Sequence, residues 1–306
     1  MAAPTTSPRM QLGPLDAATS IAAALLRALA SLVRLALRTP AGRIGLPLVV
    51  LHVILALFGQ ALAPYPPTEF HIEDHQLEGP SLQFLLGTDQ FGRDVLSRVM
   101  SGATSLISVA GAGALLGIVL GTVVGMSSGY KGGRTDEVVM RVMDAMMSFP
   151  SLLIALLVLT SLGPNPINIA GTIGIVFIAP VARVMRSSTL AIKSLEFVDA
   201  ARLRGEPNIY IIFREILPNT LPVLAVEASV RFSYSILLVA SLGFLGLGVQ
   251  PPSSDWGLMI SESRIYIVVA PWVALAPGMA VASLVIGVNL LADGIKQARE
   301  LPKREA

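Results

Sequence analysis

Two opposite charges inside an apolar stretch are the first residues whose types and spacing suggest chemistry. Glu227 and Arg231 lie four positions apart, so on a helix they share one face with the acid in the favourable N-terminal place. Charges in a membrane-spanning segment normally face the interior of a bundle or water. Two interpretations stay open: an internal ion pair, or a pair that borders a translocation cavity, where a zwitterionic molecule would meet one charge of each sign.

Residues typical of enzymes and metal sites are scarce. The 306 residues include no cysteine and only three histidines, His52, His71 and His75. There is therefore no disulfide, thiol nucleophile or thiolate metal site. The sequence also lacks a GxxxxGK[ST] phosphate loop, so the chain is not expected to hydrolyse ATP by itself. We predict no catalytic residue, no metal site and no cofactor bound by this chain.

The composition predicts the environment of these residues. Hydrophobic residues make up 53% of the chain and charged residues 14%, and the mean hydropathy is +0.70. Soluble proteins have about 25% charged residues, and disordered chains are polar. The chain is therefore expected to be an integral membrane protein. Its pI of about 9.1 accompanies a formal charge of only +2, and we predict no nucleic-acid partner.

Six stretches are long enough for the roughly 20 apolar residues that a spanning helix needs. They are Ile44–Ala63, Thr104–Met126, Val142–Leu162, Ile167–Val184, Thr220–Val249 and Val268–Ala292. We therefore expect an all-α integral membrane protein with six transmembrane helices. The remaining parts are an N-terminal segment (1–43), a loop at 64–103 and a C-terminal tail (293–306), and spans two to six form a core at 104–292.

The basic residues predict the orientation. Most of the 22 lysines and arginines fall in the N-terminal segment, the loops after spans two and four, and the tail. By the positive-inside rule these parts and both termini are cytoplasmic, and the acidic loop 64–103 lies outside. Ala17–Leu37 carries Arg27 and Arg34 within an apolar run, and Arg38 follows it. This pattern is typical of an amphipathic helix on the cytoplasmic membrane surface.

The longest cytoplasmic loop, 185–219, has helical features. A short helix is expected to end at Gly205, and Pro207 suits the first turn of a second helical segment. Such a loop is either a surface connector or a projection on which a partner docks. The small residues Ala200 and Ala201 would let a partner approach closely.

This loop also carries the residues of a known motif at matching spacing. They are Asp199, Ala200, Ala201, Gly205, Leu217 and Pro218. This pattern resembles the EAA motif of ABC-importer permeases, which forms the helix that couples the permease to its ATPase subunit. Two departures are Asp199, where the family has Glu, and Glu215, where a branched apolar residue is usual.

Three more stretches resemble the C-type permeases of dipeptide and oligopeptide importers. They are Leu86–Arg98, Asp144 with Phe149–Ser151, and Leu242–Pro252 followed by Asp255-Trp256-Gly257. With the EAA-like loop, the resemblance covers about Gly87 to Asp293. It implies a type I ABC-importer permease fold in the cytoplasmic membrane.

The resemblance also implies a set of partners. They are membrane lipid, a second permease of the B type, one or two ATPase subunits that bind ATP and Mg²⁺, and an extracytoplasmic substrate-binding protein. The substrate would be a dipeptide or oligopeptide, or nickel in some members. A stand-alone secondary transporter or channel is the alternative class, but no pair of inverted repeats supports it. A membrane-embedded enzyme is a third class, without a catalytic cluster to support it.

Three smaller features carry open interpretations. Two ion pairs at i,i+4 spacing are expected on a short interfacial helix before span two: Asp89 with Arg93, and Asp94 with Arg98. This helix is either solvated or in contact with the binding protein or partner permease. Asp144 is expected in the first turn of span three, favoured by the helix dipole or by contact with the coupling loop. The glycines at 243, 246 and 248 suit close helix packing or a gate.

Overall fold

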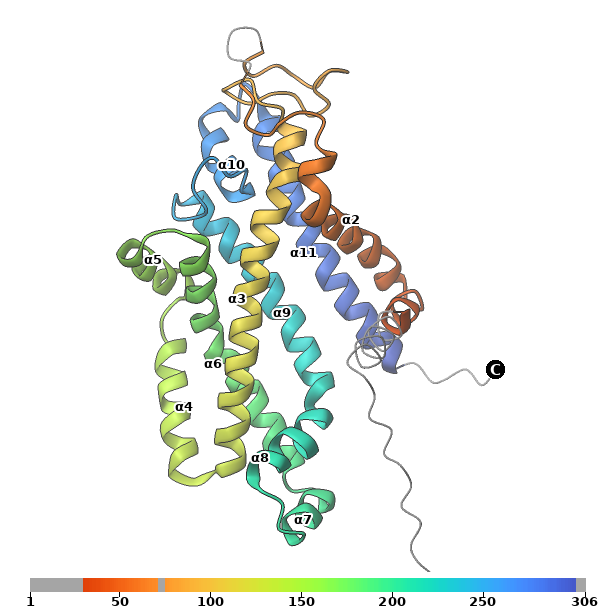
Figure 1. Ribbon diagram of the computed structural model, residues 1–306, viewed down its shortest axis with the longest axis vertical. Helices are drawn as coiled ribbons and strands as arrows, with labels where there is room; N and C mark the ends of the chain where they lie inside the picture. The colour runs from red at the N-terminus through yellow and green to blue at the C-terminus, as the bar shows by residue number, and fades with distance from the viewer. Residues whose placement is uncertain (1–29, 71–74, 301–306) are drawn as a thin grey trace, which may run out of the picture.

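The computed structural model describes residues 30–70 and 75–300, and within these ranges the chain is helical, with one isolated β-bridge between Thr88 and Asp94. The all-α prediction is confirmed. The elements form an elongated bundle (Figure 1). They are α2 (Pro40–Leu62), α3 (Val95–Lys131), α4 (Gly133–Met147), α5 (Ser151–Leu162), α6 (Pro166–Ile192), α7 (Glu196–Leu203), α8 (Asn208–Tyr210), a π-helical turn η1 (Ile211–Ile216), α9 (Leu217–Phe244), α10 (Trp256–Ser263), a 3₁₀ turn η2 (Arg264–Tyr266) and α11 (Pro271–Glu300).

Five described helices are long and apolar enough to cross a membrane, and the bent pair α4–α5 passes the same test when its two helices are taken together. The predicted third span, Val142–Leu162, is not one helix: α4 and α5 meet at an angle of 83°. Pro150 explains the break, because its ring disfavours helical geometry in the residue before it and it offers no N–H to continue the helix. The five spans and the broken pair account for the six predicted spans.

Helix α3 begins earlier than the predicted boundary at Thr104. The Asp94 carboxylate accepts hydrogen bonds from the backbone nitrogen of Ser97 at 2.8 Å and from its hydroxyl at 2.6 Å. An acid at this position satisfies an otherwise unpaired N–H of the first turn and favours helix initiation. With 37 residues, α3 is about 55 Å long, so it extends beyond the hydrocarbon layer.

A stripe of glycines holds α3 against α6. Five glycines recur at intervals of four along α3. A Cβ added to any of the first four would lie within 3.0 Å of an α6 atom, and one added to the fifth would lie within 3.4 Å. They are Gly113, Gly117, Gly121, Gly125 and Gly129. A Cβ on Gly117 would lie 2.6 Å from the Cβ of Phe177. Small residues at this spacing allow close backbone packing between membrane helices, and the repeat is visible in the sequence although the predicted spans did not use it.

Helix α2 packs along α11 and α3 through glycines and a buried histidine. His52 is 2% exposed, and its ring nitrogens lie 2.8 Å from the Leu48 carbonyl and 3.2 Å from the Ala280 carbonyl of α11. A Cβ on Gly287 of α11 would lie 2.8 Å from the Cβ of Leu48. His52 therefore links the two spans α2 and α11.

The predicted loops separate to opposite ends of the bundle. The α2–α3 loop and α10 lie at one end, and α7 and α8 project from the other end with the α3–α4 turn (Figure 1). This separation agrees with the predicted alternation of the spans, whereas the side that faces the cytoplasm stays a prediction. Residues 30–36 are helical and Leu37 lies in the following turn, but residues 17–29 of the predicted amphipathic helix and the tail from 301 onward lie outside the described residues.

Candidate functional site

The projecting segment around α7 has the predicted break. Helix α7 ends at Leu203, and Gly205 has a φ of +78°, a conformation that favours glycine. The second helical segment then runs through α8 and η1 directly into α9, in which Pro218 lies in the first turn. Because η1 has π-helical hydrogen bonding, which often marks functional sites, the join between the projection and α9 is irregular.

The inner face of α7 is fixed to the bundle by apolar packing. Val198 and Ala201 are fully buried in a cluster with Met126 of α3, Met185 of α6 and Ile216 of η1. Ala201 therefore contacts this chain, and of the two predicted small residues only Ala200 is exposed. The burial of Val198 and Ala201 thus anchors the inner face of α7 in this cluster, with η1 as its main neighbour.

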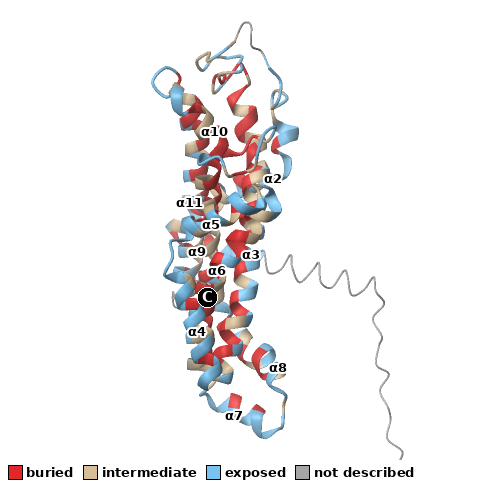
Figure 2. Ribbon diagram, turned by 90° about the vertical axis from the view of Figure 1, so that its left-hand side faces the viewer, coloured by how far each residue is buried: buried red, intermediate tan, exposed pale blue. Residues whose placement is uncertain are grey.

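The outer face of the projection presents apolar side chains. Leu203 is 89% exposed and Ile209 is 72% exposed, and Leu195, Phe197 and Phe213 are also exposed. We call these five residues the apolar tip. Figure 2 shows exposed residues over much of α7 and α8, and of these two helices α7 alone also carries buried residues. Exposed apolar side chains on a segment that projects from a bundle are typical of an interaction surface.

Polar contacts join the projection to the end of α3. The Arg202 guanidinium lies 5.3 Å from the ring centre of Tyr130 and donates to Asp199 at 2.8 Å. The Tyr130 hydroxyl donates to the Asn208 side chain at 3.3 Å. Tyr130 was not among the predicted site residues, because nothing in its local sequence shows that α3 ends beside α7.

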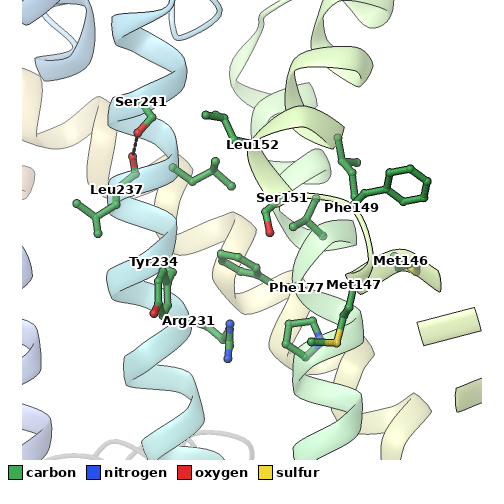
Figure 3. A pocket seen from close by; sticks show the side chains of 14 residues that line it. Met146, Met147, Phe149, Ser151, Leu152, Phe177, Arg231, Tyr234, Leu237 and Ser241 are labelled. Atoms are coloured by element: carbon green, nitrogen blue, oxygen red, sulfur yellow. Dashed lines mark hydrogen bonds between the residues drawn. The ribbon is translucent and has the colours of Figure 1, made fainter. Parts of the chain in front are cut away.

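Glu227 and Arg231 form the predicted ion pair on α9, with Arg231 Nε 2.6 Å from Glu227 Oε1. The two side chains, however, border different spaces. Arg231 lines a cavity of about 370 Å³ between α9, α6 and the α4–α5 break, shown in Figure 3. Glu227 lines a separate groove between α9, α6 and α11. Neither of these two spaces is lined by both charges, and the role of the pair at a translocation cavity stays a prediction.

The cavity beside Arg231 is mostly apolar and aromatic. Figure 3 shows Arg231 and Tyr234 projecting from α9 beside Phe177 of α6, with Met147 and Phe149 across the space. The Arg231 guanidinium lies 5.8 Å from the Phe177 ring centre and 5.6 Å from that of Tyr234. A charge in such surroundings interacts more strongly with an opposite charge than it would in water.

At the opposite end, the predicted contact residues are buried in an ion network. Asp89 is fully buried and pairs with Arg93 at 2.7 Å and with Arg98 at 2.5 Å. Both arginines also reach Glu262 of α10, at 3.2 Å and 3.3 Å. The i,i+4 pair of Asp89 and Arg93 is confirmed. We call Asp89, Arg93, Arg98 and Glu262 the outer ion network.

The other predictions for this segment are wrong. Asp94 caps α3, and its predicted pair with Arg98 is not formed because Arg98 turns to Asp89. Residues before Val95 do not form a separate helix, since Gly87 and Gly92 have φ of +72° and +71°, which breaks a right-handed helix. Glu262 was not predicted because it lies far away in the sequence.

The glycines after α9 pack closely and end the helix. A Cβ on Gly243 would lie 2.6 Å from Asp255 Oδ1 and 3.0 Å from the Cα of Gly257. Gly246 has a φ of +81°, as expected for a residue that ends a helix. These contacts support the packing interpretation of Gly243. The Asp255 carboxylate, which lies beside Gly243, is itself buried, and this burial raises its pKa to about 6.

Asp144 does not lie in the first turn of a helix, where it was predicted. It is near the C-terminal end of α4 and 3.8 Å from Arg183 of α6, so the account based on an N-terminal helix dipole is wrong. The acid in the first turn of α4 is Asp136, which makes a bidentate pair with Arg186 of α6 at 2.5 and 2.6 Å.

Comparisons with known proteins agree with this architecture. Residues 117–300 match the family described as "Binding-protein-dependent transport system inner membrane component". Among the similar curated proteins are three permeases. The glutathione transport system permease protein GsiD of Pectobacterium atrosepticum is 37% identical over 82% of this chain and 83% of its own. The dipeptide transport system permease protein DppC of Alkalihalophilus pseudofirmus is 36% identical over 86% of both chains. The di/tripeptide transport system permease protein DppC of Pseudomonas aeruginosa is 38% identical over 83% of this chain and 86% of its own.

The family match covers more than half of the chain, and it includes the glycine stripe from Gly117 onward, the α7 projection and the Glu227–Arg231 pair. The three relatives are similar over most of both chains. The chain is thus a multi-pass membrane protein and belongs to the family of binding-protein-dependent transport system inner membrane components.

Proposed function

We propose that the chain is the membrane-spanning permease subunit of an ATP-driven importer that carries dipeptides or oligopeptides across the cytoplasmic membrane. Its family membership and the peptide transport systems named for its relatives support this proposal. The chain itself is not an enzyme in this proposal, because ATP and Mg²⁺ bind to one or two separate ATPase subunits. A second permease of the B type and an extracytoplasmic binding protein complete the complex, and both termini face the cytoplasm.

The observation that carries the proposal is the apolar tip. Leu203 and Ile209 are more than 70% exposed on a segment that projects from the bundle, and the adjacent residues have the EAA-like pattern. Such a surface suits a groove on an ATPase subunit. The predicted coupling residues divide between two tasks: Asp199 and Ala200 face outward, whereas Ala201 anchors α7 to the bundle.

In the proposed mechanism, closure of the ATPase pair moves α7. Because Val198 and Ala201 belong to one buried apolar cluster with Met126 of α3 and Met185 of α6, the movement reaches α3 and α6 together, and the glycine stripe keeps these two helices close. The motion reaches α9 through η1, and the cavity beside Arg231 changes its access. ATP thereby selects between two arrangements of the same helices.

The outer ion network also has a proposed task. Asp89 and Asp94 hold the α2–α3 loop in place, while the side chains of Arg93 and Glu262 keep 11% and 22% of their surface exposed. We assign contact with the binding protein or partner permease to this exposed edge. Asp89 and Asp94 would support that contact from within the loop.

The apolar tip can be tested with two matched aspartate variants of the whole complex. Leu203→Asp places a charge on the tip, and we expect the ATPase subunits to be lost from the purified complex and uptake to fall at least tenfold. Leu82→Asp alters an equally exposed leucine in the loop at the other end, where the side chain is 101% exposed. It should leave ATPase association unchanged.

The two variants also separate a docking defect from a folding defect. Both should insert at the wild-type level, because neither side chain contributes to a buried core. If Leu203→Asp retained its ATPase subunits and peptide-stimulated ATP hydrolysis, the proposed docking role of the tip would be wrong.

A further inference from the structure

The free side of the Arg231 guanidinium suggests a ligand site inside the bundle. Among the described residues, Arg231 makes one hydrogen bond, from Nε to Glu227 at 2.6 Å. Its two terminal nitrogens therefore have no protein acceptor within the described part of the chain. Arg231 lines the cavity of about 370 Å³, and its side chain is 19% exposed.

The neighbours of Arg231 hold its guanidinium in one orientation. Glu227 fixes Nε from one side, and the rings of Phe177 and Tyr234 lie within 6 Å of the guanidinium carbon. Figure 3 shows both rings next to the Arg231 side chain. Arginine side chains held by an acid and by aromatic faces lose less conformational freedom when they bind a further group.

The remaining geometry fits a carboxylate. The terminal nitrogens of a guanidinium form a planar pair of donors that matches the two oxygens of a carboxylate. No acidic side chain lines this cavity, because Glu227 borders the other groove. An anion approaching from the cavity would therefore meet the arginine without a competing acid on the cavity wall.

The remaining cavity wall suits variable side chains. Met146 and Met147 line it with Phe149, Leu152 and Leu237. Methionine side chains are flexible and polarisable and adapt to partners of different shape. Such a wall would select by size and apolar character only weakly, whereas the arginine would recognise a group that every unmodified peptide carries.

We infer that Arg231 binds the C-terminal carboxylate of a peptide during its passage, with the peptide side chains against the methionine and aromatic wall. This inference rests on the proposed function, since it assigns the substrate group that one residue of the permease recognises. Glu227 acts as a positioning residue that orients Arg231 without touching the peptide.

A thiol-protection experiment tests this binding directly, because the chain has no native cysteine. Ser241→Cys places one thiol on the cavity wall of the reconstituted complex, and a maleimide then labels this chain. We expect Ala-Ala to reduce the rate of labelling. Ala-Ala amide lacks the carboxylate, and at equal concentration its reduction of the labelling rate should be smaller by a factor of about ten or more. With Arg231→Gln added, the two compounds should protect equally.

Uptake provides a second measurement. Any preference of the binding protein for one of the two compounds is the same in the wild type and the variants, so it drops out when their uptake ratios are compared. The ratio of uptake rates for Ala-Ala and its amide should fall about tenfold in Arg231→Gln relative to the wild type. Arg134→Gln removes a positive charge from α4 at an exposed residue that does not line the cavity and should leave the ratio unchanged. Arg231→Lys keeps the charge but not the paired donors and should give an intermediate ratio. If Arg231→Gln does not assemble, the ratio measured for Arg231→Lys tests the inference instead.

The failures of the two proposals are distinguishable. The carboxylate inference would be overturned if both compounds protected equally with Arg231 present, or if the variants lost acid and amide uptake equally. In either case, peptide uptake by the wild type would still uphold the proposed function. A wild-type complex that hydrolyses ATP but takes up neither peptide would overturn the proposed function itself.

Discussion

The two ends of the bundle position their loops by opposite means. The outer ion network pairs four charges, of which those of Asp89 and Arg98 are buried, between the α2–α3 loop, α3 and α10. The α7 projection is instead held by buried apolar residues and leaves apolar residues exposed. Both segments were predicted to contain a short helix, so the difference lies in which side chains are desolvated. Charges that are satisfied within one chain fix a loop, whereas exposed apolar side chains at the opposite end remain available to a partner.

The largest effect is expected from breaking the outer ion network. Arg98→Met keeps the length of a side chain that is 3% exposed but leaves Asp89 with only one arginine. Removing one partner of a buried ion pair costs about 3–5 kcal/mol, so the midpoint of thermal unfolding of the purified complex should fall clearly. Arg264→Met removes an exposed arginine at the same end and should shift the midpoint little.

A smaller effect at the same end should depend on pH. Burial raises the pKa of Asp255 to about 6, and its Oδ2 atom has no partner among the described residues. The unfolded chain ionises this group near pH 4, so stability should fall as the pH rises from about 4 to about 6 and stay level above that. The loss is about 3 kcal/mol.

The control for Asp255 is its uncharged counterpart. Asp255→Asn cannot ionise, and the midpoint of thermal unfolding measured between pH 4 and 6 should therefore be flatter than that of the wild type. A wild-type midpoint that rises across this range would contradict the burial argument, because it would require an ionised Asp255 to be favoured in the folded state.

The third prediction concerns the apolar end and uses two adjacent alanines. Ala201→Leu adds methylenes to a fully buried position and should cost about 1–3 kcal/mol through overpacking. Because it displaces α7, it should also reduce ATP-coupled uptake. Ala200→Leu makes the same chemical change at an exposed position, and its midpoint of thermal unfolding should remain near the wild-type value. Equal destabilisation by the two variants would mean that α7 is not anchored by its inner face.

Local sequence patterns predicted much of the architecture. The positions of the apolar stretches, the helix break at Gly205 and the Glu227–Arg231 pair follow from hydrophobic runs, helix-ending residues and i,i+4 spacing. These features depend on residues close together in the chain. The bend at Pro150 and the four-residue glycine repeat in α3 were also visible in the sequence, but length and apolarity alone, which defined the predicted spans, do not reveal them.

Other features depend on the distance between residues that are far apart in the chain. The sequence by itself determined a membrane protein with separated charges and an EAA-like loop, since composition and short-range spacing carry that information. Only the tertiary structure decided that Arg98 pairs with Asp89 and reaches Glu262, that Ala201 is buried while Ala200 is exposed, and that Glu227 and Arg231 border different spaces. The physical reason is that pairing and burial depend on which helix packs beside each face, and those neighbours are far apart in the sequence.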